Sequence, residues 1–118
     1  MYLCQLIQRM TGRWCVEYLD YGCYCGHGNS GGEPVDEVDR CCQIHDVCFG
    51  QSSCYNSWWY YLSWYQYQCN GTTCHCTDLN DDCQMSRCQC DLELSQCLGR
   101  QSYNVSNYNY NQTLCTAA

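Results

Sequence analysis

The sequence predicts a mainly helical domain, stapled by disulfide bonds, that covers residues 1–118. The chain contains 16 cysteines, a density typical of small scaffolds whose disulfides form in an oxidising compartment. Clustered cysteines can also bind zinc, but Cys-x-x-Cys pairs are absent from the sequence, so disulfides are favoured over a zinc site. Three segments also carry apolar residues at helical spacing. With 118 residues, the chain has the length of one compact domain.

The first predicted helix covers residues 2–11 and ends at Gly12. Its apolar residues recur at helical spacing and would line one face: Leu3, Leu6, Ile7 and Met10. The segment 21–34 is rich in glycine and ends at Pro34. Glycine adopts positive φ angles at little cost, so this segment is predicted to be a loop.

Two further helices are predicted at residues 36–50 and 82–98. The first of them begins with acidic residues, which favour the positive end of a helix dipole: Asp36, Glu37 and Asp39. In the second, three cysteines recur every seven residues and would share one face: Cys83, Cys90 and Cys97. The spacing therefore predicts that this face is bonded to a neighbouring element.

An aromatic segment at residues 58–68 separates these helices. Its last residues alternate and lead into Asn70-Gly71, which predicts a strand followed by a hairpin turn. Trp58 and Trp59 in this segment could pack in the core or bind a lipid interface, and both interpretations remain open. The tail from residue 101 lacks periodicity and is predicted to be attached only through Cys115.

The net charge of the chain and its glycosylation sequons narrow the classes of function that fit this sequence. The formal net charge is -7, which argues against nucleic acid as a partner. Tyrosine and tryptophan are abundant, and their amphipathic rings suit membrane–water interfaces. Three Asn-x-Ser/Thr sequons occur, beginning at Asn70, Asn104 and Asn111, and they predict a secreted, extracellular glycoprotein.

The densest chemical motif is Cys-Cys-Gln-Ile-His45-Asp46-Val-Cys at residues 41–48. On a helix, bridges at both ends would fix His45, while Asp46 points about 100° away from it. One side chain could then meet a substrate while its neighbour holds an ion. The glycine-rich loop before this helix suits Ca²⁺, which is bound by backbone carbonyls and carboxylates. Asp91 follows two cysteines and could orient His45 as the third member of a triad does.

These motifs resemble those of the secreted phospholipase A2 family. The resemblance rests on the run from Tyr21-Gly-Cys-Tyr-Cys-Gly through His45-Asp46-Val-Cys, on Cys88-Gln-Cys90-Asp91 and on the cysteine spacing between residues 69 and 97. It implies two long antiparallel helices, a short N-terminal helix, a calcium loop and a small two-stranded β-wing. It also implies calcium-dependent hydrolysis of the sn-2 ester of glycerophospholipids by a monomeric enzyme at a membrane or micelle surface.

The resemblance also implies a role for individual residues. His45 would activate water and Asp91 would orient His45. The backbone carbonyls of Tyr24, Gly26 and Gly28, with the Asp46 carboxylate, would bind Ca²⁺. Supporting roles would fall to Tyr65 and Tyr61, and an acyl channel to Leu3, Leu6 and Met10.

The disulfide pairs are likewise implied by the resemblance. Six follow the family: Cys25–Cys42, Cys41–Cys97, Cys48–Cys90, Cys54–Cys83, Cys76–Cys88 and Cys23–Cys115. The cysteines at 4, 15 and 74 depart from the common vertebrate pattern, and for these and Cys69 we expect the pairs Cys15–Cys69 and Cys4–Cys74.

Two other departures concern the site. The calcium loop between Gly28 and Asp36 is one residue longer than usual and partly resembles the bee-venom branch. Phe49 stands where most members have a second tyrosine. An alternative function is therefore a non-catalytic phospholipase-like toxin, receptor ligand or calcium-binding matrix protein.

Overall fold

A computed structural model of the chain describes residues 2–26, 31–52 and 64–115. The elements in chain order are α1 (Tyr2–Thr11), η1 (Cys15–Tyr18), α2 (Glu37–Gly50), β1 (Tyr67–Asn70), β2 (Thr73–Cys76), α4 (Asp82–Gly99), η2 (Val105–Asn107) and η3 (Gln112–Cys115). The mainly helical fold and its three predicted helices are confirmed. No helix in these described ranges is both long and apolar enough to cross a bilayer.

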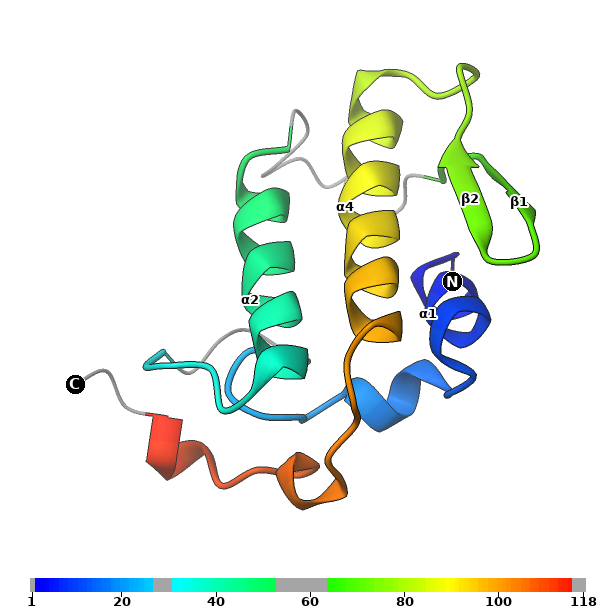
Figure 1. Cartoon of the computed structure of the whole chain (residues 1–118). Helices are drawn as coiled ribbons and strands as arrows, with labels where there is room; N and C mark the ends of the chain where they lie inside the picture. The colour runs from blue at the N-terminus through cyan, green and yellow to red at the C-terminus, as the bar shows by residue number, and fades with distance from the viewer. Residues whose placement is uncertain (1, 27–30, 53–63, 116–118) are drawn as a thin grey trace.

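The helices α2 and α4 lie side by side and run in opposite directions (Figure 1). Two disulfides, Cys41–Cys97 and Cys48–Cys90, join them. Moving seven residues forward along α2 therefore corresponds to moving seven residues back along α4, which is two turns of each helix. The heptad spacing of cysteines on α4 follows from this antiparallel register.

Seven bridges join cysteines of the described ranges, and five of them are pairs that the family resemblance implied. Besides the two between α2 and α4, these are Cys25–Cys42, Cys76–Cys88 and Cys23–Cys115. Cys83 is also disulfide-bonded, and its expected partner, Cys54, lies outside the described residues.

The expected pairs Cys15–Cys69 and Cys4–Cys74 are wrong. The structure instead contains Cys4–Cys15 and Cys69–Cys74. Cys69 and Cys74 are directly opposed in the hairpin, where antiparallel pairing brings Cβ atoms close together. Cys15 begins η1, directly after the chain turns back from α1. Both pairs therefore join cysteines that are near each other in the sequence and that one local fold brings together.

Strand β1 begins later than the strand predicted within residues 58–68. Of the described residues in segment 58–68, only those from Tyr67 onward belong to β1, and Gly71 lies in the turn that leads to β2. Trp58 and Trp59 lie outside the described residues. The β-wing itself is confirmed as a two-stranded antiparallel sheet, and it stands beside α1 and α4 (Figure 1).

The C-terminal tail is held by much more than Cys115, contrary to expectation. Gly22 donates its backbone N–H to Asn107 O at 2.9 Å, and Tyr110 donates to Asp20 O at 3.3 Å. The Asn107 side chain donates to Asp36 Oδ2 at 2.9 Å. These bonds satisfy the polar backbone of two irregular segments at once. The tail is therefore hydrogen-bonded to the segment that precedes α2.

Candidate active site

His45 and Asp91 face each other across the α2–α4 interface. His45 Nε2 lies 2.8 Å from Asp91 Oδ1. Both interhelical disulfides flank this contact, one on each side along the helices. The Asp91 side chain is buried, and that of His45 is 11% exposed. The pair is thus fixed by covalent bonds rather than by the flexible side chains alone.

The second oxygen of Asp91 is also engaged. The Tyr65 hydroxyl donates to Asp91 Oδ2 at 2.6 Å, and Tyr65 is buried. Burial, with the Asp91 carboxylate beside it, raises the pKa of Tyr65 above its ordinary value. The hydroxyl therefore keeps its proton and remains a donor. With both oxygens bonded, the carboxylate has one orientation toward His45.

This arrangement favours one His45 tautomer on chemical grounds. An ionised carboxylate only accepts hydrogen bonds, so beside an ionised Asp91 the ring proton belongs on Nε2. Nδ1 is left with a lone pair that can accept a proton. The Phe49 ring packs against the imidazole, with 4.2 Å between ring centroids. Phe49 thus holds the imidazole by packing, although it lacks the hydroxyl of the tyrosine that is usual at this position.

Asp46, the next residue on α2, lies in a different environment. Its Oδ2 atom is buried and has no hydrogen-bond partner among the described residues. Burial raises the pKa of Asp46 from 3.8 to about 6. A buried carboxylate oxygen without a donor is costly unless a cation approaches it. The donor set is that of a hard cation: Asp46 lines the same cavity as Tyr24 and Gly26, whose backbone carbonyls are oxygen donors of the kind Ca²⁺ prefers.

Asp39 fixes the loop that carries Tyr24 and Gly26. This carboxylate is fully buried and accepts the backbone N–H groups of Cys23 and Tyr24 at 2.8 Å each. It also accepts the N–H of Val35 at 3.0 Å, so both ends of the loop converge on one side chain. Because the N–H groups turn toward Asp39, the loop conformation depends on this buried acid.

Gly22 permits the loop backbone to lie close to the Asp39 carboxylate. It has φ of +59°, and a Cβ built there would lie 2.4 Å from Asp39 Cγ. Only a residue without a side chain fits both requirements. Gly26 is similarly constrained, with φ of +102° and a Cβ that would lie 2.8 Å from Asp20 N. The glycines of this segment are therefore needed for backbone packing as well as for turning.

An apolar cavity of about 160 Å³ opens beside these groups. Its lining includes His45, Asp46, Tyr24 and Gly26, which carry polar groups. Its apolar lining comes from α1, η1 and α4: Leu3, Ile7, Tyr18, Leu19, Leu94 and Leu98. A carboxylate, a histidine with an available lone pair and an apolar channel are thus combined in one site.

Two of the three residues expected in the acyl channel lie elsewhere. Leu3 lines the cavity, but Leu6 and Met10 do not. They pack in a second core cluster together with Tyr65 and Cys88. Leu3 and Ile7 are four residues apart on one face of α1, and Leu6 and Met10 are four apart on an adjacent face. The helical spacing was correct, but it could not tell which face meets the cavity.

Several predicted site residues lie outside the described residues: Gly28, Tyr61, Trp58 and Trp59. Two others that shape the site were missed at the sequence level. Asp39 was interpreted only as an acid of the first helical turn, although it lies two residues before the Cys41-Cys42 pair and cysteine is among the residue types most often buried. Ile7 was assigned to the apolar face without a role in the cavity.

Comparisons with known proteins show the family of this chain. The family model described as phospholipase A2 matches residues 1–108. A curated relative, acidic phospholipase A2 E from Naja oxiana, is 43% identical over 102 residues, which are 86% of this chain and 85% of the relative. The range matched by the family model, residues 1–108, includes α1, the loop before α2, both long helices and the hairpin. The chain therefore belongs to the phospholipase A2 family.

Proposed function

We propose that this phospholipase A2 hydrolyses the sn-2 ester of glycerophospholipids in a calcium-dependent reaction, with His45 as the general base. The single observation that carries the proposal is that His45, which lines the apolar cavity, contacts the buried carboxylate of Asp91. Such a base must reach a water molecule through Nδ1 while a carboxylate orients the ring through Nε2.

In the proposed first step, Nδ1 of His45 accepts a proton from water as the water oxygen bonds to the ester carbonyl carbon. The imidazolium that forms has N–H groups on both nitrogens, and Asp91 stabilises it through the existing bond to Nε2. In the second step, Nδ1 returns the proton to the glycerol oxygen as the carbon–oxygen bond breaks. The products are a free fatty acid and a lysophospholipid.

We further propose that Asp46 and the backbone carbonyls of Tyr24, Gly26 and Gly28 bind Ca²⁺. The buried Oδ2 atom of Asp46, which has no hydrogen-bond partner in the part of the chain that the structure describes, supports this assignment. When bound, the ion supplies positive charge that stabilises the negative oxygen of the tetrahedral intermediate. The backbone N–H of Gly26 would donate to the same oxygen, as preorganised amides do in acyl transfer. The family is generally calcium-dependent, which supports the choice of ion.

The family acts at lipid interfaces, and we propose that this extracellular chain meets lipid as a monomer at the cavity. Leu19 lines the cavity and is 41% exposed, and Trp14 is 65% exposed. Apolar and amphipathic side chains of this kind insert into the boundary of a bilayer, whereas a chain of net charge -7 gains little from anionic lipid.

One assay tests the catalytic proposal. Phosphatidylcholine vesicles with different acyl chains at sn-1 and sn-2 are incubated with the protein in Ca²⁺ or in EDTA, and the released fatty acid is identified. We expect sn-2 release that EDTA and His45→Gln both abolish. His75→Gln is the matched control, because His75 is an exposed residue of the β2 strand. Release that persists in EDTA, or in His45→Gln, would refute the mechanism.

A further inference from the structure

The three sequons occupy exposed turns rather than packed elements. Asn70 is the last residue of β1 at the hairpin turn, Asn104 is the N-cap of η2, and Asn111 directly precedes η3. All three side chains are exposed. An acceptor asparagine must present its side-chain amide to solvent with room for a bulky sugar. These positions meet that requirement without any change in the fold.

The hydrogen bonds of these asparagines leave the reacting atom available. Asn104 uses Oδ1 to accept the Ser106 N–H at 3.0 Å. Asn111 uses Oδ1 to accept the Thr113 N–H at 3.1 Å and its hydroxyl at 2.8 Å. A glycosidic bond forms at Nδ2 and leaves Oδ1 as an acceptor. Both 3₁₀ turns would therefore keep their capping bonds after modification.

Two other asparagines show the contrasting arrangement. Asn80 donates through Nδ2 to Gln66 O at 2.8 Å, and Asn107 donates to Asp36 Oδ2 at 2.9 Å. Neither begins a sequon. Asn80 and Asn107 thus donate hydrogen bonds through the side-chain nitrogen, whereas the bonds of Asn104 and Asn111 are accepted by Oδ1.

Two exposed residues of the same tail, Val105 and Tyr108, line one cavity, and we call them the apolar patch of the tail. Val105 is 75% exposed and Tyr108 is 43% exposed. An open cavity of about 450 Å³ is lined by Tyr103, Val105 and Tyr108, together with Arg13, Val16 and Glu17 of the opposing segment. A group that covers these side chains would remove apolar surface from water, which is favourable.

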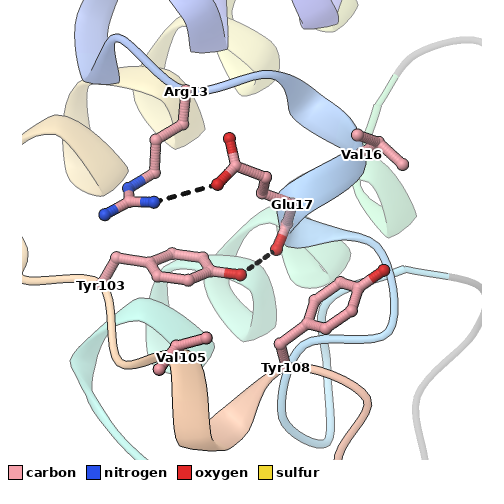
Figure 2. A pocket seen from close by; sticks show the side chains of 6 residues that line it. All are labelled: Arg13, Val16, Glu17, Tyr103, Val105 and Tyr108. Carbon is pink, nitrogen blue, oxygen red and sulfur yellow. Dashed lines mark hydrogen bonds and ion pairs between the residues drawn. The ribbon is translucent and has the colours of Figure 1, made fainter.

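The polar groups of this cavity already bind one another. In Figure 2, Arg13 points to the Glu17 carboxylate, and the Tyr103 hydroxyl points to the Glu17 carbonyl. The Arg13 guanidinium also lies 4.1 Å from the Tyr103 ring centre. Apolar side-chain surface also lines the cavity, from Val16, Val105 and the ring of Tyr108. Asn104 stands between two lining residues, Tyr103 and Val105.

We propose that Asn70, Asn104 and Asn111 carry N-linked glycans and that the glycan on Asn104 covers the apolar patch of the tail. In the modification, Nδ2 bonds to the anomeric carbon of an oligosaccharide whose bond to a lipid-linked diphosphate breaks. The diphosphate is the leaving group, and Nδ2 loses one proton to the transferase. The proposal rests on passage through a secretory route and is independent of the catalytic mechanism.

The first experiment measures occupancy in protein secreted from eukaryotic cells. Intact mass is recorded before and after treatment with peptide N-glycosidase in ¹⁸O water, which leaves a labelled aspartate at each former site. We expect three labelled positions. Thr72→Ala, Ser106→Ala and Thr113→Ala should each lose one glycan, whereas Thr72→Ser should keep it.

Material retained inside the cells is analysed in the same way, so a secretion defect still gives a result. A polypeptide mass without sugar in both pools would overturn the proposal. Loss of hydrolysis with full glycosylation would instead count against the catalytic proposal alone.

The second experiment tests the covering role. Ser106→Ala removes the Asn104 glycan, and Ser102→Ala is a matched control on the same exposed tail that leaves the sequon intact. We expect Ser106→Ala to bind more of an apolar fluorescent dye and to aggregate at lower concentration than the control. Both variants should hydrolyse dispersed short-chain lipid equally, which verifies folding. Equal dye binding by the two variants would refute the covering role.

Discussion

The raised pKa of the Asp46 carboxylate gives a quantitative prediction for the metal-free protein. Burial raises the pKa of Asp46 from 3.8 to about 6, so the folded state binds this proton more tightly than the unfolded chain does. Between about pH 4 and pH 6 the folded state therefore holds more protons, and its stability falls as pH rises. The contribution of this group is fully present below the unfolded pKa and is lost as pH rises through the folded pKa.

The size of the effect follows from the same shift. A rise of about two pKa units corresponds to roughly 3 kcal/mol, at about 1.36 kcal/mol for each unit. Asp46 is only partly buried as a residue, so solvent screening makes this figure an upper bound. In EDTA, the free energy of unfolding should thus decrease by up to ~3 kcal/mol from pH 4 to pH 7 through this one group.

The assay is urea unfolding in EDTA across this pH range, with disulfides intact. Asp46→Asn is the matched control, because it keeps the shape and removes the titration. The difference between the two proteins isolates Asp46 from all other carboxylates. Adding Ca²⁺ should reverse the trend for the wild type, since the ion binds only the ionised form and stabilises the folded state by mass action. Parallel curves for wild type and Asp46→Asn would refute the reasoning.

Two further substitutions test the supporting contacts. Tyr65→Phe leaves one oxygen of buried Asp91 without its donor, so unfolding should become easier by about 1.5–3 kcal/mol in chemical denaturation; an unchanged midpoint would contradict the bracing role. Gly22→Ala would place a Cβ against Asp39 at a positive φ, and we expect a loss of at least about 2 kcal/mol and weaker Ca²⁺ binding in calorimetry. Gly12→Ala is its control, because Gly12 also has a positive φ but open space around it, so it should cost only about 1 kcal/mol.

The helices and the central pair could be predicted from the sequence because local periodicity and dense motifs encode them. The apolar spacing of residues 2–11 and the heptad cysteines of 82–98 each specify a face, and a helix is the structure that forms such faces. His45 and Asp91 were assigned through the family motif, which fixes their distance from the bridging cysteines. No long-range geometry was needed for either inference.

Features that depend on loop-to-loop contact could not be predicted. Four cysteines at 4, 15, 69 and 74 allow three connectivities, and the sequence alone does not rank them. The structure selects the pairs that α1 with η1 and the hairpin bring together locally. The tail is a similar case, because its attachments are single hydrogen bonds between irregular segments, and such segments have no periodic pattern in the sequence.

The role of Asp39 was missed for a related reason. An acid in the first turn of a helix has a sufficient local explanation in the helix dipole. Its burial became apparent only when the two ends of the preceding loop were seen to converge on it. A local explanation that is adequate can thus conceal a tertiary role.

The His45–Asp91 pair and the loop beside Asp46 are supported by separate contacts, so a substitution can affect one of them without affecting the other. The His45–Asp91 pair depends on two helices, two interhelical disulfides and Tyr65. The loop beside Asp46 depends instead on Asp39 and on the tail. We therefore expect a change in loop length, such as the additional residue that the family resemblance implies between Gly28 and Asp36, to alter the affinity of the proposed Ca²⁺ site without moving His45. Because the orienting carboxylate accepts no bond from the loop among the described residues, substitutions there should raise the Ca²⁺ concentration required for half-maximal activity while leaving the rate at saturating Ca²⁺ largely unchanged.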